Sequence, residues 1–213
     1  MKSNITFYNN NENKTIRDKL IEAAITIGGN DCLRAITSRS LSNTSGVNQF
    51  YIYKEFDSIN EVMDCASDAI TTYFQKLLTF HLQVFENNLF TYERSYKFFN
   101  SLLDDLLLTD VSVYSFFHKY YNRNYSLYSF GSELSKKNLK PIMDIIKTFL
   151  VDEIDVYLAT VHLCESVVKY TLLIKNQKIE DNEESRKIIY DFIFSPIEKY
   201  LNFEFESNDK STN

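Results

Sequence analysis

The chain has 213 residues, of which only four are glycine and two are proline, and its net charge at pH 7 is −6. A β-sandwich or barrel needs turns at short intervals, often built on glycine or proline, so this composition excludes an all-β fold. A doubly wound α/β fold is disfavoured because the glycine pair Gly28-Gly29 has no G-x-G-x-x-G around it. We therefore expect an all-α protein.

The composition also bears on where the protein works. No apolar run is long enough to span a membrane, and the polar sequence after Lys2 is not that of a secretory signal. Cys32, Cys65 and Cys164 are odd in number and lack CxxC spacing, which favours reduced thiols and a cytoplasmic location. The negative net charge gives no overall basic character of the kind found in nucleic-acid-binding domains.

The first helix is predicted to begin at a T-x-x-D capping box formed by Thr15 and Asp18. Apolar residues then recur with the helical period on one face, namely Ile16, Leu20, Ala23, Ala24 and Ile27. Glycine is common just after the last residue of a helix. Gly28 and Gly29 are therefore expected to end this helix.

Two short helices are predicted next. Thr37 is the expected N-cap of the second helix, Leu41 faces inward, and Gly46 follows its end. Asn48 is the expected N-cap of a third helix that runs to about Lys54. Two short helices joined through a glycine-containing turn are typical of a helix-turn-helix.

A long fourth helix is predicted after an S-x-x-E capping box at Ser58 and Glu61. Its buried stripe is expected to contain Val62, Ala66, Ala69, Ile70, Tyr73, Leu77 and Phe80. Later helices are predicted at about 89–108, from 110 onward, and at about 141–150, 152–176 and 182–201, which makes about nine in all. A polar break is expected at Ser135 to Asn138, and Pro196 is expected to kink the last helix.

The helix predicted at 152–176 is apolar on more than one side. One face holds Ile154, Leu158, Val161, Val168 and Leu172, and another holds Val156, Leu163, Val167 and Ile174. This pattern suggests a subunit interface, although burial inside a single chain would produce the same pattern.

The residues around the predicted helix-turn-helix carry a family resemblance. They are Thr37, Arg39, Leu41 and Ser42, then Gly46-Val47, then Tyr53 and Phe56, then Ser58 and Glu61. This set, within about residues 15–65, resembles the TetR family of transcriptional regulators. The resemblance implies a ligand-responsive DNA-binding regulator that acts as a repressor. It would bind a palindromic operator as a homodimer through its last two helices, and a small, largely apolar effector would release it.

The resemblance also implies how the chain is divided. Residues 14–57 are expected to form a three-helix DNA-binding domain, and residues 58–201 a helical effector-binding and dimerisation domain. The termini, 1–13 and 202–213, are polar without a sustained period and are expected to be disordered tails. The implied partners are a double-stranded DNA operator and a small-molecule effector. We expect no cofactor, no metal, no membrane association and no enzymatic activity.

Groove chemistry assigns roles to the side chains of the helix-turn-helix. Gln49 can bond adenine N6 and N7, and Phe50 and Tyr51 can pack on thymine methyl groups. Arg39 can reach guanine O6 and N7. The residues expected to contact DNA, at base edges or at phosphates, are Thr37, Arg39, Asn48, Gln49, Phe50, Tyr51, Tyr53 and Lys54. As alternatives, Phe50 and Ile52 could be core residues and Arg39 could pair with a carboxylate.

Three departures from the family pattern motivate a second hypothesis. The stretch 57–60 lacks the lysine that often contacts phosphate, and bulky Phe50 and Tyr51 replace a small residue. Residues 1–62 contain seven basic and seven acidic residues, so they carry no net charge. The alternative is a helical dimer that kept the TetR fold, lost operator binding and serves as an interaction protein.

An aromatic segment is the candidate effector site. Residues 112–130 contain eight aromatics in 19 positions, and aromatic walls with a few polar groups are typical of small-molecule pockets. The expected lining residues are Tyr73, Phe99, Phe117, Tyr121 and His162. The alternative is that these aromatics fill a helical core in a protein without tryptophan.

Enzymatic sites find little support in the sequence. His81, His118 and His162 have no E-x-x-H or H-E-x-x-H setting, which argues against di-iron and zinc-protease chemistry. Asp104-Asp105 is similar to a diphosphate-binding acidic pair but lacks a matching partner motif. We therefore expect His81 and His118 to be hydrogen-bonded or exposed.

Overall fold

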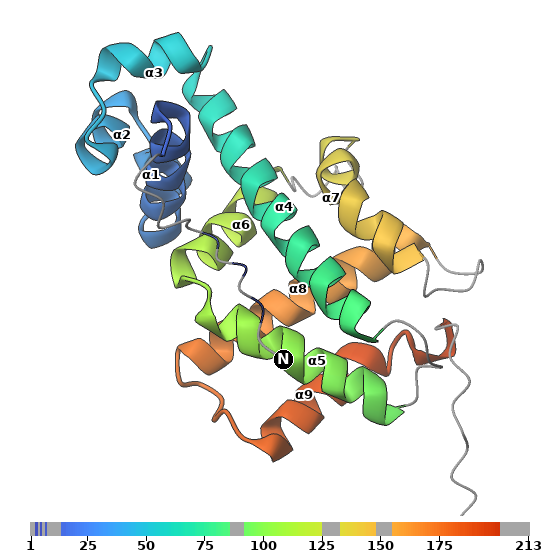
Figure 1. The fold of residues 1–213 in the computed structure, drawn as a ribbon. Coiled ribbons are helices and arrows are strands. Elements are labelled where there is room, and N and C mark those ends of the chain that lie inside the picture. The colour runs from blue at the N-terminus through green and yellow to red at the C-terminus, as the bar shows by residue number, and fades with distance from the viewer. Residues whose placement is uncertain are drawn as a thin grey trace, which may run out of the picture. The chain divides into compact units, whose positions relative to one another are not determined.

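A computed structural model of the chain describes residues 3, 5, 7, 14–85, 92–124, 133–147 and 155–200, without the side chains of 84, 85, 121–124, 133–138 and 199. The described residues form nine α-helices and no strand, which confirms the predicted all-α fold (Figure 1). The helices are α1 (Ile16–Asn30), α2 (Ser38–Ser45), α3 (Gln49–Glu55), α4 (Ile59–Phe85), α5 (Tyr92–Leu108), α6 (Val111–Asn124), α7 (Glu133–Ile146), α8 (Val156–Lys175) and α9 (Glu183–Phe194). Short 3-10 helices occur at Leu33–Ala35 and Glu198–Tyr200.

The chain divides into two compact units. The helix-turn-helix unit comprises residues 4–76 and 107–142, and the α5/α8/α9 unit comprises residues 1–3, 77–106 and 143–213. Helix α4 is continuous and contributes to both units, with the change at residue 77. The functional domains expected at 14–57 and 58–201 stay predictions. None of the described helices is long and apolar enough to cross a membrane.

Side-chain caps begin the helices of the helix-turn-helix unit where the sequence predicts them. Thr15 and Asp18 form both bonds of a capping box at the start of α1. Thr37 accepts a hydrogen bond from the Ser40 amide at the start of α2. Ser58 accepts one from the Glu61 amide at the start of α4, at 3.1 Å. Each cap satisfies an amide that lacks a partner within its helix.

The prediction that Gly28 and Gly29 end the first helix is wrong. Helix α1 continues to Asn30, and both glycines are buried inside it. A Cβ atom on Gly29 would overlap the backbone of Ser112 on α6, lying 2.6 Å from its Cα and 2.7 Å from its carbonyl carbon. These glycines therefore allow α6 to approach α1 closely, a role that outweighs the poor helix propensity of glycine.

A lysine from α6 secures the same contact. Lys119 Nζ donates to the carbonyl oxygens of Gly29 and Asp31, both at 2.7 Å, and lies 3.1 Å from that of Gly28. The last carbonyls of a helix have no partner within the helix, and a cation there also interacts favourably with the helix dipole. Helix α6 is thus joined to the C-terminal end of α1 by close backbone packing and by charge.

Two further predicted helix boundaries are wrong. Helix α7 begins at Glu133 and contains Pro141, so the polar run Ser135 to Asn138 is helical and does not break the chain. Helix α9 ends at Phe194, before Pro196, and is not kinked by it. Because proline has no amide hydrogen, the helical ladder stops there. Ile197 bonds to the carbonyl three residues back, at Phe194.

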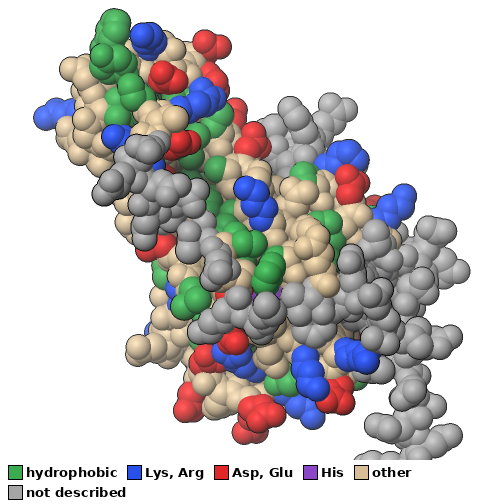
Figure 2. Space-filling model, in the orientation of Figure 1, with side chains coloured by type: hydrophobic (Ala, Val, Ile, Leu, Met, Phe, Trp, Pro, Cys, Tyr) green, Lys and Arg blue, Asp and Glu red, His purple; other side chains and the backbone are tan. Residues whose placement is uncertain are grey.

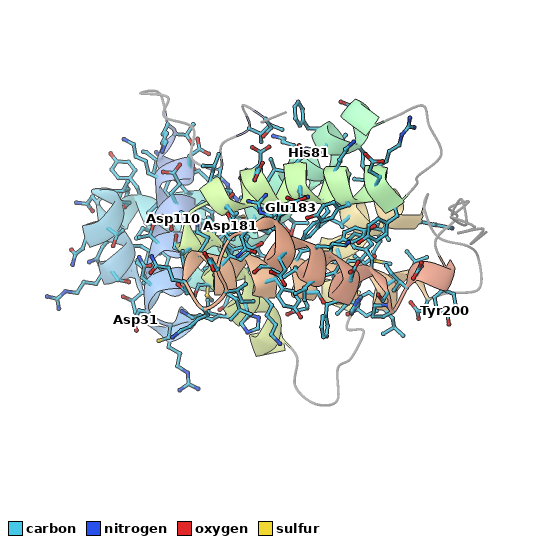
Figure 3. All side chains as sticks on the ribbon, turned by 90° about the horizontal axis from the view of Figure 1, so that it is seen from below. Asp31, His81, Asp110, Asp181, Glu183 and Tyr200 are labelled. Atoms are coloured by element: carbon cyan, nitrogen blue, oxygen red, sulfur yellow. The ribbon has the colours of Figure 1, made fainter. Side chains whose placement is uncertain are left out.

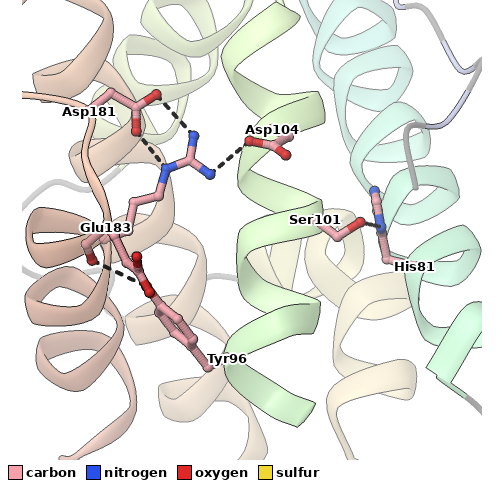
Figure 4. A network of polar contacts seen from close by, with 7 residues as sticks. His81, Tyr96, Ser101, Asp104, Asp181 and Glu183 are labelled. Atoms are coloured by element: carbon pink, nitrogen blue, oxygen red, sulfur yellow. Dashed lines mark hydrogen bonds and ion pairs between the residues drawn. The ribbon is translucent and has the colours of Figure 1, made fainter. Parts of the chain in front are cut away.

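The α5/α8/α9 unit is held by apolar packing and by one ion-pair cluster. Its buried residues include Phe99, Leu103, Ile189, Tyr190 and Ile193. Asp181 and Glu183 lie at the N-terminal end of α9 (Figure 3). Arg186 on α9 contacts Asp181 through two nitrogens and Asp104 on α5 through the third, at 2.5, 2.9 and 2.7 Å (Figure 4). This arginine therefore joins α5 to α9.

Candidate nucleic-acid interface

The turn between α2 and α3 orients the third helix. Gly46 has a φ of 71°, a left-handed conformation that costs other residues roughly 1 to 2 kcal/mol. Val47 after it is buried, as are Leu41 on α2 and Ile52 on α3. These three apolar side chains pack one face of each short helix into the unit. The opposite face of α3 is consequently left to solvent.

The outer face of α3 is aromatic. Phe50 is 72% exposed and Tyr53 61% exposed, whereas Ile52 is fully buried. Figure 2 shows hydrophobic side chains on the surface in the region where α3 lies in Figure 1. The alternative that Phe50 is a core residue is therefore wrong, and the one that Ile52 is core is confirmed. All eight residues expected to contact DNA are exposed.

Two basic side chains of the helix-turn-helix are also exposed. Arg39 on α2 is exposed and makes no ion pair among the described residues, so it does not pair with a carboxylate there. Lys54 Nζ lies 5.9 Å from the centre of the Tyr51 ring, and the Phe50 and Tyr51 rings meet edge to face at 5.6 Å. The exposed surface thus combines aromatic rings with two cations.

Two of the expected DNA contacts also stabilise their own helices. The Thr37 hydroxyl caps α2, and the Asn48 side-chain oxygen accepts from the Phe50 amide at 2.9 Å. Asn48 caps α3 through its side-chain carbonyl oxygen, so its side-chain NH₂ group takes no part in the cap. Gln49, on the same turn, makes no side-chain hydrogen bond within the described structure.

Arg17 on α1 contacts the C-terminal end of α3. The sequence patterns did not indicate this role of Arg17. Its guanidinium donates to the Glu55 carbonyl at the end of α3 at 2.5 Å, and lies 4.1 Å above the Phe56 ring. It also contacts Glu61 at 3.4 Å and the Cys65 sulfur at 3.1 Å on α4. One side chain therefore links α1, α3 and α4.

Two of the expected effector-lining residues converge in the helix-turn-helix unit. Tyr73 on α4 and Phe117 on α6 are both buried, and both rings contact Phe74, at 5.6 and 5.5 Å between centroids. The Tyr73 hydroxyl lies 2.6 Å from that of Thr109. Apolar walls with a hydroxyl pair of this kind could bind a small apolar molecule, but they equally form a packed core.

The other candidates lie elsewhere. Phe99 is buried in the α5/α8/α9 unit against Phe194, at 6.3 Å between ring centroids. His162 on α8 donates through Nε2 to the carbonyl of neighbouring Ile193, at 2.9 Å. Both residues contact the C-terminal end of α9, and both belong to a different unit from Phe74. The side chain of Tyr121 lies outside the described residues.

Much of the aromatic run is core. Tyr114, Phe116, Phe117 and Tyr120 on α6 are all buried. The Phe116 ring packs where Gly28 would otherwise carry a side chain and stacks on Tyr120 at 5.8 Å. The remaining aromatics of the run, Tyr125, Tyr128 and Phe130, lie outside the described residues.

Comparisons with known proteins define the fold. No protein-family model matches the sequence, and no curated protein matches it significantly. A structure from Shewanella sp. PV-4, assigned to the TetR family of transcription regulators, superimposes with a TM-score of 0.65 at 11% identity, covering 86% of this chain and 98% of its own. A TetR family transcription regulator from Marinobacter aquaeolei VT8 gives 0.61 at 9% identity, covering 84% and 93%.

The chain has the fold of the TetR family. A third structure extends the comparison. SmeT, the repressor of the Stenotrophomonas maltophilia multidrug efflux pump SmeDEF, superimposes with a TM-score of 0.51 at 13% identity, covering 88% of this chain and 91% of its own. In the TetR fold the exposed face of α3 belongs to the second helix of the helix-turn-helix, which enters the major groove in proteins that use this motif.

A largely buried hydrogen-bonded cluster contains His81, Asp105 and Ser101, and the sequence patterns did not indicate that these residues meet. His81 Nε2 donates to the Asp105 carboxylate at 2.8 Å. His81 Nδ1 accepts from the Ser101 hydroxyl at 3.1 Å (Figure 4). The His81 and Asp105 side chains are almost fully buried. The pKa of His81 is lowered, chiefly by burial, against the opposing pull of Asp105.

Ser101, His81 and Asp105 form a hydroxyl–imidazole–carboxylate chain of hydrogen bonds, as in the catalytic triad of a hydrolase. A triad also requires donors that stabilise the oxyanion, such as amides that are free to bind it. Ser101 and Asp105 lie one turn apart inside α5, where the amides belong to the helix. Asp105 also accepts from the Ser3 amide at 2.9 Å. The group therefore ties α4, α5 and Ser3 together, while Asp104 pairs separately with Arg186.

Proposed function

We propose that this protein is a TetR-type transcriptional regulator, a repressor in the cytoplasm that binds a palindromic operator as a homodimer. The observation that carries the proposal is the outer face of α3. Ile52 anchors the helix, while Gln49, Phe50 and Tyr53 are left in solvent, as are the basic Arg39 and Lys54. Exposed aromatics and exposed cations suit contact with bases and with phosphates.

The DNA-binding proposal is tested by selection from random duplexes. The full-length chain is incubated with random double-stranded DNA, and the retained sequences are determined over several rounds. We expect an inverted repeat whose half-sites are centred one helical turn apart, about 34 Å, or a multiple of it. Recovery of unrelated sequences without a shared motif would contradict the proposal.

Homodimerisation through α8 and α9 is part of the proposal. Leu158 on α8 is half exposed, as is Ile188 on α9, and Phe192 on α9 is 67% exposed. The two helices pack on each other, so one surface can hold all three apolar side chains. Large exposed apolar side chains on a pair of packed helices favour an interface between subunits.

The effector is proposed to be small and largely apolar, with Tyr73, Phe99, Phe117, Tyr121 and His162 as candidate contacts. The continuity of α4 supports coupling between effector and operator, because this helix starts beside α3 and continues into the other unit. An effector and an operator that act through one equilibrium must weaken each other equally. Titrating each ligand in the presence of the other tests this, and tight effector binding with unchanged operator affinity would exclude it.

One observation favours a second candidate function. Residues 1–62 carry seven basic and seven acidic residues, and 57–60 contain no lysine or arginine. A helix-turn-helix with this balance suits a protein that kept the fold and acts as an interaction protein. The salt dependence of DNA binding distinguishes the two functions. Basic side chains that neutralise phosphates release counterions, so the affinity of a DNA-binding protein for DNA falls steeply as the salt concentration rises.

A further inference from the structure

The first turn of α3 lacks the side chains that usually read guanine. Arginine and lysine are the usual partners of guanine O6 and N7, whereas glutamine pairs with adenine N6 and N7. The first basic residue of α3 is Lys54, in its last turn. The preceding exposed positions are Gln49, Phe50 and Tyr51, one amide and two aromatic rings. The turns of α3 nearest α2 therefore offer adenine contacts and apolar contacts.

Phe50 needs an apolar partner. The residue is 72% exposed, and in the described part of the chain its ring meets the Tyr51 ring edge to face, at 5.6 Å between centroids. In the major groove the apolar group displayed on a base edge is the thymine methyl. Arg39 on α2 and Lys54 in the last turn of α3 are exposed cations of the same helix-turn-helix, and cations attract phosphates. Charge and apolarity together fit one partner, duplex DNA with thymine in the groove.

We propose that α3 reads a half-site of A·T pairs, with Gln49 on an adenine and the Phe50 ring on the methyl group of a neighbouring thymine. This inference rests on the proposed DNA-binding function and names its DNA sequence class. This contact would explain the bulky Phe50, since a small side chain could not bury the thymine methyl group as completely.

The test compares thymine with deoxyuridine, which lacks only the methyl group. Duplexes carrying the selected half-site are prepared with each half-site thymine replaced in turn by deoxyuridine, and binding is measured by fluorescence anisotropy. We expect one replacement to weaken binding of the unaltered protein about three- to fivefold, the effect of losing one buried carbon group. Phe50→Ala should bind more weakly and lose this difference.

Tyr53→Ala supplies the matched control, because Tyr53 is also a largely exposed aromatic on the same helix, at 61%, and would contact phosphate under the proposed function. It should weaken binding to both duplexes by the same factor and keep the thymine preference. Circular dichroism confirms that both variants fold, as their exposure predicts.

Three results would overturn the inference. The first is a selected half-site of G·C pairs, and the second is equal affinity for the thymine and deoxyuridine duplexes at every position. The third is a thymine preference that persists in Phe50→Ala. In each of these cases sequence-specific binding, and with it the proposed function, would stand. Binding without any sequence preference, or capture of a protein partner by the α3 surface in place of DNA, would overturn both.

Discussion

Gln49 and Lys54 lie on the same short helix and should affect DNA binding in different ways. Gln49→Ala is expected to weaken specific operator binding by about 1 to 3 kcal/mol and to spare non-specific binding, because it removes a base contact. Lys54→Ala should weaken both kinds of binding and reduce the slope of log K against log salt by about one. Anisotropy titrations over a range of salt measure both quantities. An unchanged specificity ratio in Gln49→Ala would remove Gln49 from base readout.

His81 should make the fold sensitive to acid. Burial lowers its pKa below the ordinary 6.5, so the folded protein holds a neutral imidazole while the unfolded chain takes up a proton below about pH 6.5. The free energy of unfolding should therefore fall as pH drops from about 6.5 towards the folded pKa, by at most about 1.4 kcal/mol per pH unit from this group. Above pH 7 this contribution should be constant.

Urea unfolding at several pH values measures the effect of His81. The groups around His81 are the Asp105 carboxylate and the Ser101 hydroxyl, with Asp104 and the chain's amino terminus acting at longer range. In His81→Gln the dependence on pH in this window should become shallower. His118→Gln, at an exposed histidine, controls for removal of one imidazole. A His81→Gln curve parallel to that of the unaltered protein would show that His81 does not contribute.

At the scale of elements, the contact between α1 and α6 leaves no room for a side chain at Gly29. A methyl group on Gly29 would meet the backbone of Ser112, which cannot rotate away as a side chain can. Gly29→Ala should therefore lower the free energy of unfolding by about 1 to 3 kcal/mol through overpacking. The better helix propensity of alanine would return at most about 1 kcal/mol.

Gly28→Ala is the matched comparison for Gly29→Ala. Its Cβ atom would lie 2.7 Å from a ring carbon of Phe116 and 3.0 Å from the side chain of Ile36. Side chains adjust more readily than backbone, so its cost should be smaller than that of Gly29→Ala in the same chemical denaturation experiment. Equal stability of Gly29→Ala and the unaltered protein would mean that α6 is free to move away from α1.

The elements show which features a sequence can predict. Capping by Thr15, Thr37 and Asn48 depends on residues three or fewer apart, so local pattern suffices. The role of Gly28 and Gly29 depends on α6, more than 80 residues later, and local pattern led to the wrong boundary. The contacts of Arg17 and the pairing of His81 with Asp105 also join residues on different helices, 38 and 24 residues apart, so local pattern did not indicate them. The outward residues of α3 were predictable because motif spacing sets them.

For the molecule as a whole, the surface of α8 and α9 should control assembly. Phe192→Glu places a charge on an apolar side chain that is 67% exposed, and the resulting desolvation cost should convert a dimer to a monomer. Leu108→Glu is the matched control, since Leu108 is 68% exposed at the end of α5. Analytical ultracentrifugation measures the result. A dimer that persists in Phe192→Glu would place the interface elsewhere.

The whole-molecule view also explains which part of the candidate site was hard to predict. The residues proposed to contact DNA lie within one helix-turn-helix, whereas the effector candidates divide between two units, with Tyr73 and Phe117 in one and Phe99 and His162 in the other. Aromatic content alone does not separate a pocket from a core, and the buried rings of α6 show that much of it is core.

The central claim is that the exposed face of α3 binds a specific DNA sequence. The most direct measurement is the affinity of the full-length chain for the selected palindrome and for a scrambled duplex of equal length and composition, at about 50 mM and about 200 mM salt. We predict a preference for the palindrome of about 10³-fold or more, and a steep loss of affinity at the higher salt. Equal affinity for the two duplexes, or affinity that does not change with salt, would contradict the claim.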